Sequence, residues 1–376
     1  MIYLDSAATT KPCQAAVDAA MKTMETFGNP SSLHRLGIDA EKLVEKAREC
    51  VARRLDVDKK YLYFTSGGTE ANNTAILGAA YGGKRRGSHL ITTAIEHPSV
   101  LETFKRLEDE GFSVTYLKPD ANGIVSLEAL KNALTRETIL VSVMYVNNET
   151  GMIQPVDRMK PIIREVSDFC MLHSDMVQAF GKLPCKPKRW GIDMATVSAH
   201  KIHGLKGTGA LYVEKAGFRS LLMGGEQQKG IRPGTENVAG IAAFGAACAQ
   251  AEENSAGLTA LREQLKNGIL REIDQVRING DGEENSGAVL NVSFLGTRAE
   301  ILLHSLERHE IYVSTGSACS SRKPQPSHVL RAMELSPKEI EGAVRFSFDK
   351  NITSSDIDKT VEALKQEVAA IRRYVR

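Results

Sequence analysis

The stretch from Asp175 to Lys201 holds residue types that could act together in catalysis. An apolar run, Phe169 to His173, precedes Asp175 and predicts a buried strand. A second run, Asp193 to Ser198, predicts another strand just before Lys201. If the two strands are parallel neighbours, their carboxyl ends meet at one edge of a sheet, where α/β proteins bind ligands. The spacing therefore predicts that an acid and a lysine lie together.

A lysine in such a place can bind a carbonyl cofactor. A partly desolvated lysine has a lowered pKa and forms a Schiff base. Pyridoxal phosphate (PLP) needs such a lysine, and its pyridinium nitrogen needs an acidic partner. The alternative interpretation is that Lys201 is a surface lysine and that Asp175 caps a helix. This stretch by itself leaves both interpretations open.

The composition fits a large globular protein and excludes several classes. The chain has 376 residues, of which 42% are hydrophobic and 25% charged, enough for two domains and a buried core. The formal net charge of +2 gives no overall field for nucleic acid or membrane. Charges interrupt the apolar runs, which argues against a transmembrane helix, and the N-terminus lacks the pattern of a signal peptide. We therefore expect no direct nucleic-acid or membrane partner.

The cysteines are Cys13, Cys50, Cys170, Cys185, Cys248 and Cys319. None belongs to a C-x-x-C pair, which argues against a zinc ribbon or a thioredoxin motif. In a chain of this size, scattered cysteines fit the reducing cytosol, mostly as small buried hydrophobic residues. We therefore expect a cytoplasmic protein without a metal site, in which at least one thiol is reactive.

A glycine-rich turn between a strand and a helix predicts a site for a phosphate group. Tyr61 to Thr65 has the aromatic and β-branched character of a strand, and Ala71 to Ala80 has a helical pattern. The turn between them contains Gly68 and Thr69. Backbone N–H groups at a helix N-terminus bind phosphate, and the Thr69 hydroxyl can add a donor. The turn is neither a Walker A motif nor a G-x-G-x-x-G fingerprint, and many such turns are glycine-rich for geometry only.

Strand and helix patterns alternate from about residue 61 to residue 213. Such alternation predicts a mostly parallel sheet covered by helices. Polar residues again follow the predicted strands. His97 comes at the end of a strand in 88–98, and Asn148 follows a strand at 138–146. We expect these side chains at the same sheet edge as the acid and the lysine.

The C-terminal part has an α+β pattern and three segments that suggest function. Residues 224–238 are a long polar stretch rich in glycine, and loops of this length are usually functional. Arg345 lies inside an apolar strand pattern at 343–348, where a charged side chain has to be paired or to hold a ligand. Residues 314–321 are small and polar and surround Cys319, which predicts a flexible loop with one thiol.

These residues belong to motifs that occur in the order YLDSAATT, FTSGGTEANN, EHPSV, VNNETG, HSDMVQAFGK, SAHKIHGLKG, RPGTEN, STGSACSS and VRFSF. Together the motifs resemble those of the NifS/IscS-type cysteine desulfurases, which are PLP enzymes of the class-V aminotransferase family. The resemblance runs from residue 1 to about residue 350, and the ordered set is far more specific than any single motif. It implies the α/β fold of aspartate aminotransferase. A large domain, 13–257, would hold a mostly parallel seven-stranded sheet, and a smaller α+β domain, 1–12 and 258–376, would carry the cysteine loop.

The resemblance implies the roles of the central residues. Lys201 would bind PLP through a Schiff base and later move the α-proton, and Asp175 would pair with the pyridinium nitrogen. His97 would stack on the ring and help with proton transfer. Arg345 would clamp the substrate carboxylate, for which its bidentate fork is suited. Cys319 would be the nucleophile.

The resemblance also implies residues that surround the cofactor. Gln178 and Asn148 would hydrogen-bond near the phenolic oxygen of the ring, and Asn148 would also contact the substrate. Thr235 would reach the phosphate from the other subunit of a homodimer. The remaining phosphate-binding residues would be Gly68, Thr69, Ser198 and His200.

The implied activity is the removal of sulfur from L-cysteine, which yields L-alanine and a persulfide on Cys319. The sulfur would pass to an acceptor protein for tRNA thiolation, thiamine synthesis or iron–sulfur cluster synthesis. Ser6 and Ala199 depart from the usual family residues without removing any chemistry. The ending I-R-R-Y-V-R lacks the tail by which IscS-type members dock an iron–sulfur scaffold, which favours a tRNA-thiolation or thiamine-pathway sulfurtransferase as the acceptor.

Two other hypotheses fit parts of the pattern. A selenocysteine or cystine lyase would use the same fold without depending on a protein cysteine. A catalytically silent scaffold would only bind a sulfur-acceptor protein, and the presence of Lys201, Asp175, His97, Cys319 and Arg345 argues against it. Turnover of cysteine to alanine distinguishes the scaffold from the enzymes, and dependence on Cys319 distinguishes the enzymes from each other.

Overall fold

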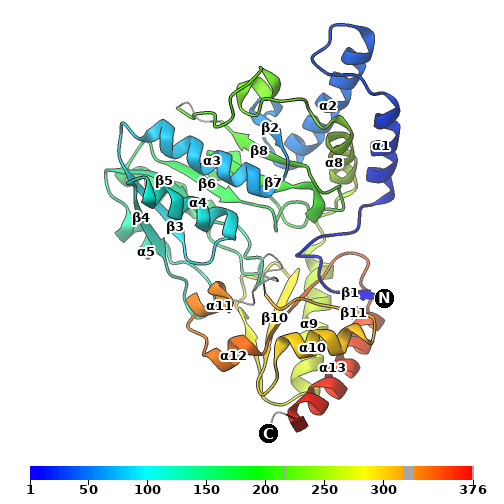
Figure 1. Cartoon of the computed structure of the whole chain (residues 1–376). Coiled ribbons are helices and arrows are strands. Elements are labelled where there is room, and N and C mark those ends of the chain that lie inside the picture. Colours follow the sequence, from blue (N-terminus) through cyan, green and yellow to red (C-terminus); the bar gives the residue numbers. More distant parts are fainter. Residues whose placement is uncertain (215–216, 317–325, 375–376) are drawn as a thin grey trace.

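The structure is a computed structural model, and it describes residues 1–214, 217–316 and 326–374. Cys319 lies outside the described residues. The large sheet consists of β2 (Leu62–Thr65), β3 (His89–Thr93), β4 (Ser113–Leu117), β5 (Thr138–Ser142), β6 (Met171–Asp175), β7 (Met194–Ser198) and β8 (Gly209–Val213). These strands lie in the order β2-β8-β7-β6-β5-β3-β4, as Figure 1 shows in the upper half of the molecule.

The predicted, mostly parallel, seven-stranded sheet is confirmed. β8 is the exception, since it runs antiparallel to both of its neighbours, β2 and β7. β6 and β7 are parallel neighbours, with Asp175 opposite Thr196. The strand predicted at 169–173 lies two residues later, so that Asp175 is the last residue of β6 and not the residue that follows it.

Helices cover both faces of this sheet. They are α1 (Gln14–Glu25), α2 (Arg35–Arg54), α3 (Gly68–Gly83), α4 (Pro98–Asp109), α5 (Leu127–Ala133), α6 (Met159–Val166), α7 (Pro187–Trp190) and α8 (Val238–Gln250). The predicted helix at 71–80 starts earlier, at Gly68, so the glycine-rich turn is itself the first turn of α3. The helix α1 was not predicted from the sequence.

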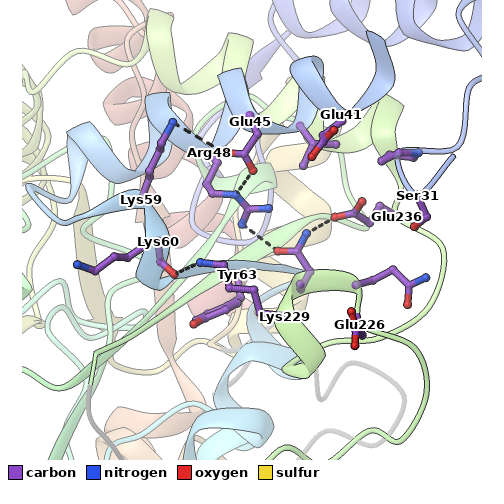
Figure 2. Close-up of a pocket in the computed structure, with 14 residues that line it drawn as sticks. Ser31, Glu41, Glu45, Arg48, Lys59, Lys60, Tyr63, Glu226, Lys229 and Glu236 are labelled. Atoms are coloured by element: carbon purple, nitrogen blue, oxygen red, sulfur yellow. Dashed lines mark hydrogen bonds and ion pairs between the residues drawn. The ribbon is translucent and has the colours of Figure 1, made fainter. Parts of the chain in front are cut away.

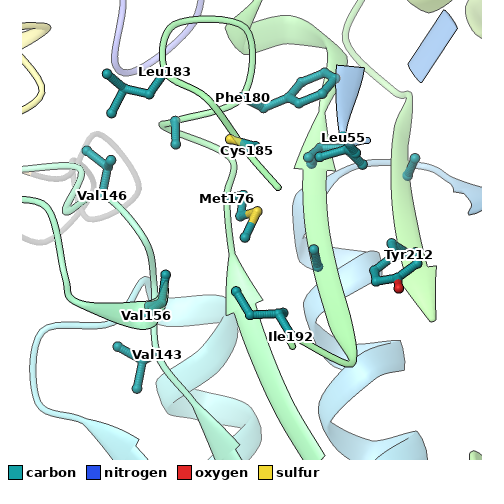
Figure 3. Packing of buried hydrophobic residues seen from close by; sticks show 14 of the residues in the cluster. Leu55, Val143, Val146, Val156, Met176, Phe180, Leu183, Cys185, Ile192 and Tyr212 are labelled. Carbon is teal, nitrogen blue, oxygen red and sulfur yellow. The ribbon is translucent and has the colours of Figure 1, made fainter. Parts of the chain in front are cut away.

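Successive residues of the central strands point to opposite faces, as the pleat of a strand requires. Leu140 packs in the cluster that α3 and α4 form on one face. Val141 packs in the cluster on the other face. Figure 3 shows part of the second cluster, in which Met176 follows the end of β6 and Ile192 precedes the start of β7. Buried packing on both faces holds the strand ends, and therefore the residues that follow them, in fixed positions.

A second group of elements forms what we call the small-sheet region. Its strands are β1 (Ile2–Tyr3), β9 (Val276–Asn279), β10 (Val289–Phe294), β11 (Ile311–Tyr312) and β12 (Ala343–Ser347). Its helices are α9 (Ser255–Glu272), α10 (Ala299–Glu307) and α13 (Ser354–Tyr374), whereas α11 (His328–Ala332) and α12 (Pro337–Glu341) pack toward the large sheet. β12, β10 and β9 form an antiparallel sheet, and β1 pairs with β11 in parallel.

The N-terminal residues pack with the C-terminal part of the chain. Ile2 and Leu4 share a core with Phe294, Phe346 and Leu364. In Figure 1 the blue strand β1 lies beside β11 and far from α1. The division of the chain into domains 13–257 and 1–12 plus 258–376 stays a prediction. Among the described helices, none has the length and apolar character needed to cross a bilayer.

Candidate active site

The ends of β6 and β7 bring the acid and the lysine to one edge, as the sequence predicted. β6 ends at Asp175, and β7 ends at Ser198. The next three residues, 199–201, form a single 3-10 turn that ends with Lys201. The charges of Asp175 and Lys201 both act on the pKa of His97, so both lie near its ring.

Neutral donors hold the carboxylate of Asp175. Asn72 Nδ2, from α3, donates to Asp175 Oδ2 at 2.7 Å, and the backbone N–H of Val177 donates to Asp175 Oδ1 at 2.9 Å. The side chain is buried, with 6% of its surface exposed. A carboxylate that accepts hydrogen bonds from neutral groups stays fixed without losing its charge to an ion pair. It therefore remains available to a cationic partner at the sheet edge.

His97 caps α4 and is held in one tautomer. The backbone N–H of Ser99 donates to His97 Nδ1 at 3.1 Å, and Ser99 Oγ lies 2.8 Å from the same nitrogen. Because a backbone N–H can only donate, Nδ1 is an acceptor, and the proton of the neutral ring is on Nε2. Burial lowers the pKa of His97; the negative charge of Asp175 partly opposes this shift, and the positive charge of Lys201 adds to it. The ring is therefore neutral near pH 7.

Asn72 and Ser99 join the acid to the histidine, and the sequence analysis assigned a role to neither. Asn72 Nδ2 donates to Ser99 Oγ at 2.9 Å as well as to Asp175, so the four side chains form one chain of hydrogen bonds. Both residues are buried and polar. Their signal in the sequence was an asparagine in the apolar helix pattern at 71–80 and a serine directly after the His-Pro pair.

Residues 7–9, which we call the N-terminal arm, contact Lys201. Lys201 Nζ donates to the carbonyl oxygens of Ala7 at 2.5 Å and of Ala8 at 2.8 Å. Gln178 Nε2 also donates to Ala7 O, at 3.0 Å, and His200 Nδ1 lies 3.1 Å from Thr9 Oγ1. Burial and the nearby lysines lower the pKa of His200 to about 4. The arm therefore orients the lysine, the glutamine and a neutral histidine together.

Arg345 faces this edge from the small-sheet region. It lies in the middle of β12 and is almost fully buried. Its Nη2 pairs with Asp5 Oδ1 at 2.8 Å, and its Nη1 donates to the carbonyl oxygen of Asn148 at 3.0 Å. The sequence predicted that this charge would be paired or would hold a ligand, and the structure shows the pairing. Because Asp5 and Ala7, which Lys201 contacts, belong to the same N-terminal segment, Arg345 lies near Lys201.

Glu149 lies next to residues on both sides of the segment 317–325, which contains Cys319. It is fully buried, and Ser327 Oγ donates to its Oε2 at 2.5 Å. A Cβ atom on Gly316 would lie 3.6 Å from the same oxygen. Gly316 and Ser327 flank the segment 317–325, so both flanks of the segment that carries Cys319 lie next to Asn148. The sequence analysis did not single out Glu149. Its signal was an acid in the VNNETG motif, directly after the strand predicted at 138–146.

Thr235 is exposed on the surface of the chain. Its loop is held by an ion pair of 2.9 Å between Arg232 Nε and Glu70 Oε1 of α3. Thr235 lines a cavity of about 290 Å³ together with Phe27. Within one chain, Thr235 is therefore presented outwards.

Comparisons with known proteins identify the family. The model of the class-V aminotransferases matches residues 2–360. A protein of Clostridium botulinum strain Hall named cysteine desulfurase IscS is 42% identical over 371 residues, which are 96% of this chain and 93% of that protein. The chain belongs to the cysteine desulfurases of the class-V aminotransferase family.

Solved structures of the family agree over nearly the whole length. A NifS-like protein superposes with a TM-score of 0.92 at 35% identity and covers 98% of this chain and 99% of its own. The structure of SspA in complex with cysteine has a TM-score of 0.82 at 33% identity and covers 93% of this chain and 99% of its own. PLP is the cofactor of the class-V aminotransferases, and this member of the family is a PLP-dependent enzyme.

The described residues fit PLP. Gln178 Oε1 and Ser198 Oγ are buried polar atoms without a hydrogen-bond partner among the described residues. Such atoms are rare in folded proteins and indicate a missing ligand or water. α3 begins at Gly68, where an added Cβ would lie 3.1 Å from Val177 Cγ2 and 3.8 Å from Ser198 Cβ, so the N-terminus of α3 adjoins both. A helix N-terminus beside unpaired polar atoms suits the cofactor phosphate.

Proposed function

We propose that the protein is a cysteine desulfurase that converts L-cysteine to L-alanine and places the sulfur on Cys319. One observation carries the proposal. Lys201 and Asp175 lie at the same sheet edge as buried polar atoms that have no partner in the part of the chain that the structure describes, and a buried arginine faces them. The printed names of the relatives and the solved complex of SspA with cysteine support the substrate.

The residues of the edge suit distinct tasks. When bound, PLP supplies an electron sink for negative charge that develops on the amino acid. The fixed carboxylate of Asp175 would hold the pyridinium nitrogen and its proton. Lys201 Nζ binds the cofactor and moves the α-proton of the substrate. His97, with its proton on Nε2, would give that proton during the reaction.

The sulfur step balances without a further reagent. The C–S bond of cysteine breaks, and a bond forms between that sulfur and Sγ of Cys319. The bonding electrons stay with carbon, which takes up a proton and becomes the methyl group of alanine. Cys319 becomes a persulfide. Since only the thiolate attacks, Cys319 has to lose its proton before the step.

The test compares two cysteines in the purified, PLP-loaded protein. Cys319→Ser should keep the absorbance of the bound cofactor but form neither alanine nor a protein persulfide. Cys50→Ser is the matched control, because Cys50 is half-buried in α2, and it should keep full turnover. Alanine formation with free sulfide in Cys319→Ser would indicate a lyase, and no turnover in the unmodified protein would indicate a scaffold. Either result would overturn the proposal.

We also propose that a second copy of the chain completes the site with Thr235. Exposed apolar residues gather between α1 and α2, and Phe27 is 80% and Leu33 96% exposed. We call this set the α1–α2 surface, and it consists of Met21, Met24, Phe27, Leu33, Leu36 and Ile38. Contiguous apolar surface of this kind marks an interaction site. Because Thr235 shares a cavity with Met24 and Phe27, a copy that covers this surface also covers Thr235.

A second cavity continues this surface. It has a volume of about 550 Å³ and is lined by charged residues of α2 and of the loop that carries Thr235. Figure 2 shows Arg48 at its centre, bonded to Glu45. Arg48 Nη1 also donates to Gln228 Oε1 at 2.9 Å. Gln228 Oε1 also accepts from the backbone N–H of Phe64, at 2.8 Å. The loop is therefore anchored to β2 and presents Thr235 in a defined position to a partner.

Mixed dimers test this arrangement. Lys201→Ala and Thr235→Ala chains should each bind PLP poorly alone. If Thr235 acts on the partner's site, a dimer of the two different chains contains one complete site and should regain PLP affinity and about half of the turnover. Mixing Lys201→Ala with itself is the control. No recovery in the mixed dimer, or a monomer by light scattering, would overturn the proposal.

The sulfur acceptor completes the proposal. We expect a cytoplasmic protein that passes sulfur from Cys319 to an acceptor protein. The candidates are a tRNA-thiolation sulfurtransferase, a thiamine-pathway sulfurtransferase and an iron–sulfur scaffold. Radiolabelled sulfur from cysteine should appear on one purified acceptor and not on the others. Label on none of them, with a labelled Cys319, would contradict an acceptor of these classes.

A further inference from the structure

Arg345 uses two of its three guanidinium nitrogens within the protein. Nη2 pairs with Asp5 Oδ1 at 2.8 Å, and Nη1 donates to Asn148 O at 3.0 Å. Nε is buried and has no hydrogen-bond partner among the described residues. The two ionic partners differ in exposure, since 2% of the Arg345 side chain and 20% of the Asp5 side chain are exposed. The arginine therefore has one unused donor and one exchangeable partner.

A substrate carboxylate needs more than that unused donor. Two-point binding by arginine uses two neighbouring N–H groups, such as those on Nε and Nη2. Asp5 already accepts from one of the two N–H groups of Nη2. A carboxylate that binds Nε and Nη2 together therefore meets the carboxylate of Asp5 at the same nitrogen. Two carboxylates at one nitrogen repel each other, so the second carboxylate binds more tightly when Asp5 moves away.

Hydrogen bonds fix the backbone of Asp5, but its side chain is partly exposed to solvent. Asp5 O accepts from the backbone N–H of Ala8 at 2.9 Å, and Asp5 forms a β-bridge with Ser347. Only the side chain can leave Arg345, and its exposure allows water to solvate the released carboxylate. Arg345 cannot leave in the same way, because an unpaired buried charge is costly. The incoming carboxylate therefore replaces Asp5 as the partner of a charge that stays in place.

We propose that Asp5 is a built-in competitor for the substrate carboxylate, which occupies Arg345 in the resting enzyme and is displaced by L-cysteine. Asp5 is a positioning residue that acts through Arg345 and sets the substrate affinity. The inference rests on the proposed function, since it assumes that Arg345 receives the substrate. It adds a reason for substrate selection. A ligand without a carboxylate has nothing to exchange for Asp5.

The central experiment replaces Asp5 in the PLP-loaded, full-length enzyme. Asp5→Asn removes the competing charge and leaves Arg345 buried without an ionic partner. The KM for L-cysteine and the Kd for the product L-alanine should both fall by at least about tenfold, because the incoming carboxylate no longer has to displace a like charge from Arg345. The kcat should change little. In a thermal melt, L-alanine should raise the Tm of the variant more than that of the unmodified enzyme.

Two controls separate this effect from a general change of charge. Asp349 is a buried acid that accepts from Ser6 Oγ at 3.1 Å. Asp349→Asn removes the same charge nearby but keeps the pair of Asp5 and Arg345, so the Kd for L-alanine should change by less than about twofold. Cysteamine, which is cysteine without its carboxylate, is the matched ligand. Its affinity should be equal in the unmodified enzyme and in Asp5→Asn.

Asp5→Glu keeps the proposal testable if Asp5→Asn does not fold. The longer acid retains the charge but fits Arg345 less well, so the KM should fall by a smaller factor. A rise in KM and in the Kd for L-alanine in either variant, with normal kcat, would show that Asp5 only orients Arg345 and would overturn the inference. That result would leave the proposed desulfurase activity intact. Loss of cysteine turnover in the unmodified enzyme would instead refute the proposed function.

Discussion

Asp175 and Arg345 carry the opposite charges of the site. The large sheet forms one wall of the site and holds Asp175, whereas the small-sheet region forms the other wall and holds Arg345, and the two charges are held in different ways. At the edge of the large sheet, Asp175 accepts hydrogen bonds only from neutral groups, Asn72 and the backbone of Val177, among the described residues. On the wall from the small-sheet region, Arg345 is paired with a carboxylate, Asp5. A charge held by neutral donors suits a cofactor that stays bound. A charge held by an exchangeable ion pair suits a substrate that enters and leaves at every turnover.

The largest expected effect is on the wall of the large sheet. Asp175→Asn keeps the shape and removes the charge that pairs with the pyridinium nitrogen. The kcat should fall by roughly 100-fold, because hydrogen bonds to charged groups contribute ~1.5–3 kcal/mol. The KM for L-cysteine should stay nearly the same, which is the opposite of the pattern expected for Asp5→Asn. Steady-state kinetics and the Kd for PLP, measured by absorbance titration, check the prediction.

Asn72→Ala is the matched control for this wall. It removes a neutral donor from Asp175 and leaves the charge, so kcat should fall by only about fivefold, consistent with a neutral hydrogen bond of ~1 kcal/mol. If Asp175→Asn changed KM and left kcat unaltered, the contrast between a fixed cofactor charge and an exchangeable substrate charge would be wrong.

A smaller effect should separate the two regions by pH. In the large-sheet region, burial lowers the pKa of His173 to about 3, burial and nearby lysines lower that of His200 to about 4, and burial lowers that of His97. Burial raises the pKa of Glu96 to about 8. At the contact between α12 and the small-sheet region, hydrogen bonds from Ser336 and from Arg277 of β9 lower the pKa of Glu339 to about 2.

The signs of these shifts predict which region opens first in acid. Below the ordinary histidine pKa of about 6.5, the unfolded chain binds protons on these three histidines, whereas the folded chain leaves them neutral. Glu96 acts in the opposite direction, because above about pH 4.5 the folded chain keeps a proton on it that the unfolded chain releases. The large-sheet region therefore loses stability as the pH falls from about 6.5 toward 4. The contribution of Glu339 is complete above about pH 4.5 and is lost only below it.

Hydrogen exchange of peptides measures this difference directly. At pH 5, peptides from β5 to β7 should lose protection relative to pH 7, while peptides from β10 and β12 should keep it. His173→Asn removes one of the three histidines, and its loss of protection on acidification should be smaller. Earlier opening of β10 and β12 at pH 5 would refute the order.

The part of the site that follows strand ends could be predicted from the sequence. A buried parallel strand has a strong apolar pattern, and its carboxyl end is a known location for ligands, so Asp175 and Lys201 were recognised together. Asn72 was not, because an asparagine on an apolar helix looks like a weak helix residue until its partners are known. Glu149 was missed for a similar reason, since its contact, Ser327, is 178 residues away.

The order of motifs in the amino-acid sequence by itself determined the family and the PLP fold. The sequence also determined the pair of Asp175 and Lys201, because strand periodicity and local turns are short-range properties. Only the tertiary structure decided how each charge is held. The ion pair of Asp5 and Arg345 joins residues 340 positions apart, and the arm that contacts Lys201 packs with the C-terminal strands. Such partners depend on which surfaces pack together and on how deeply they are buried, and neither quantity can be read from spacing along the chain.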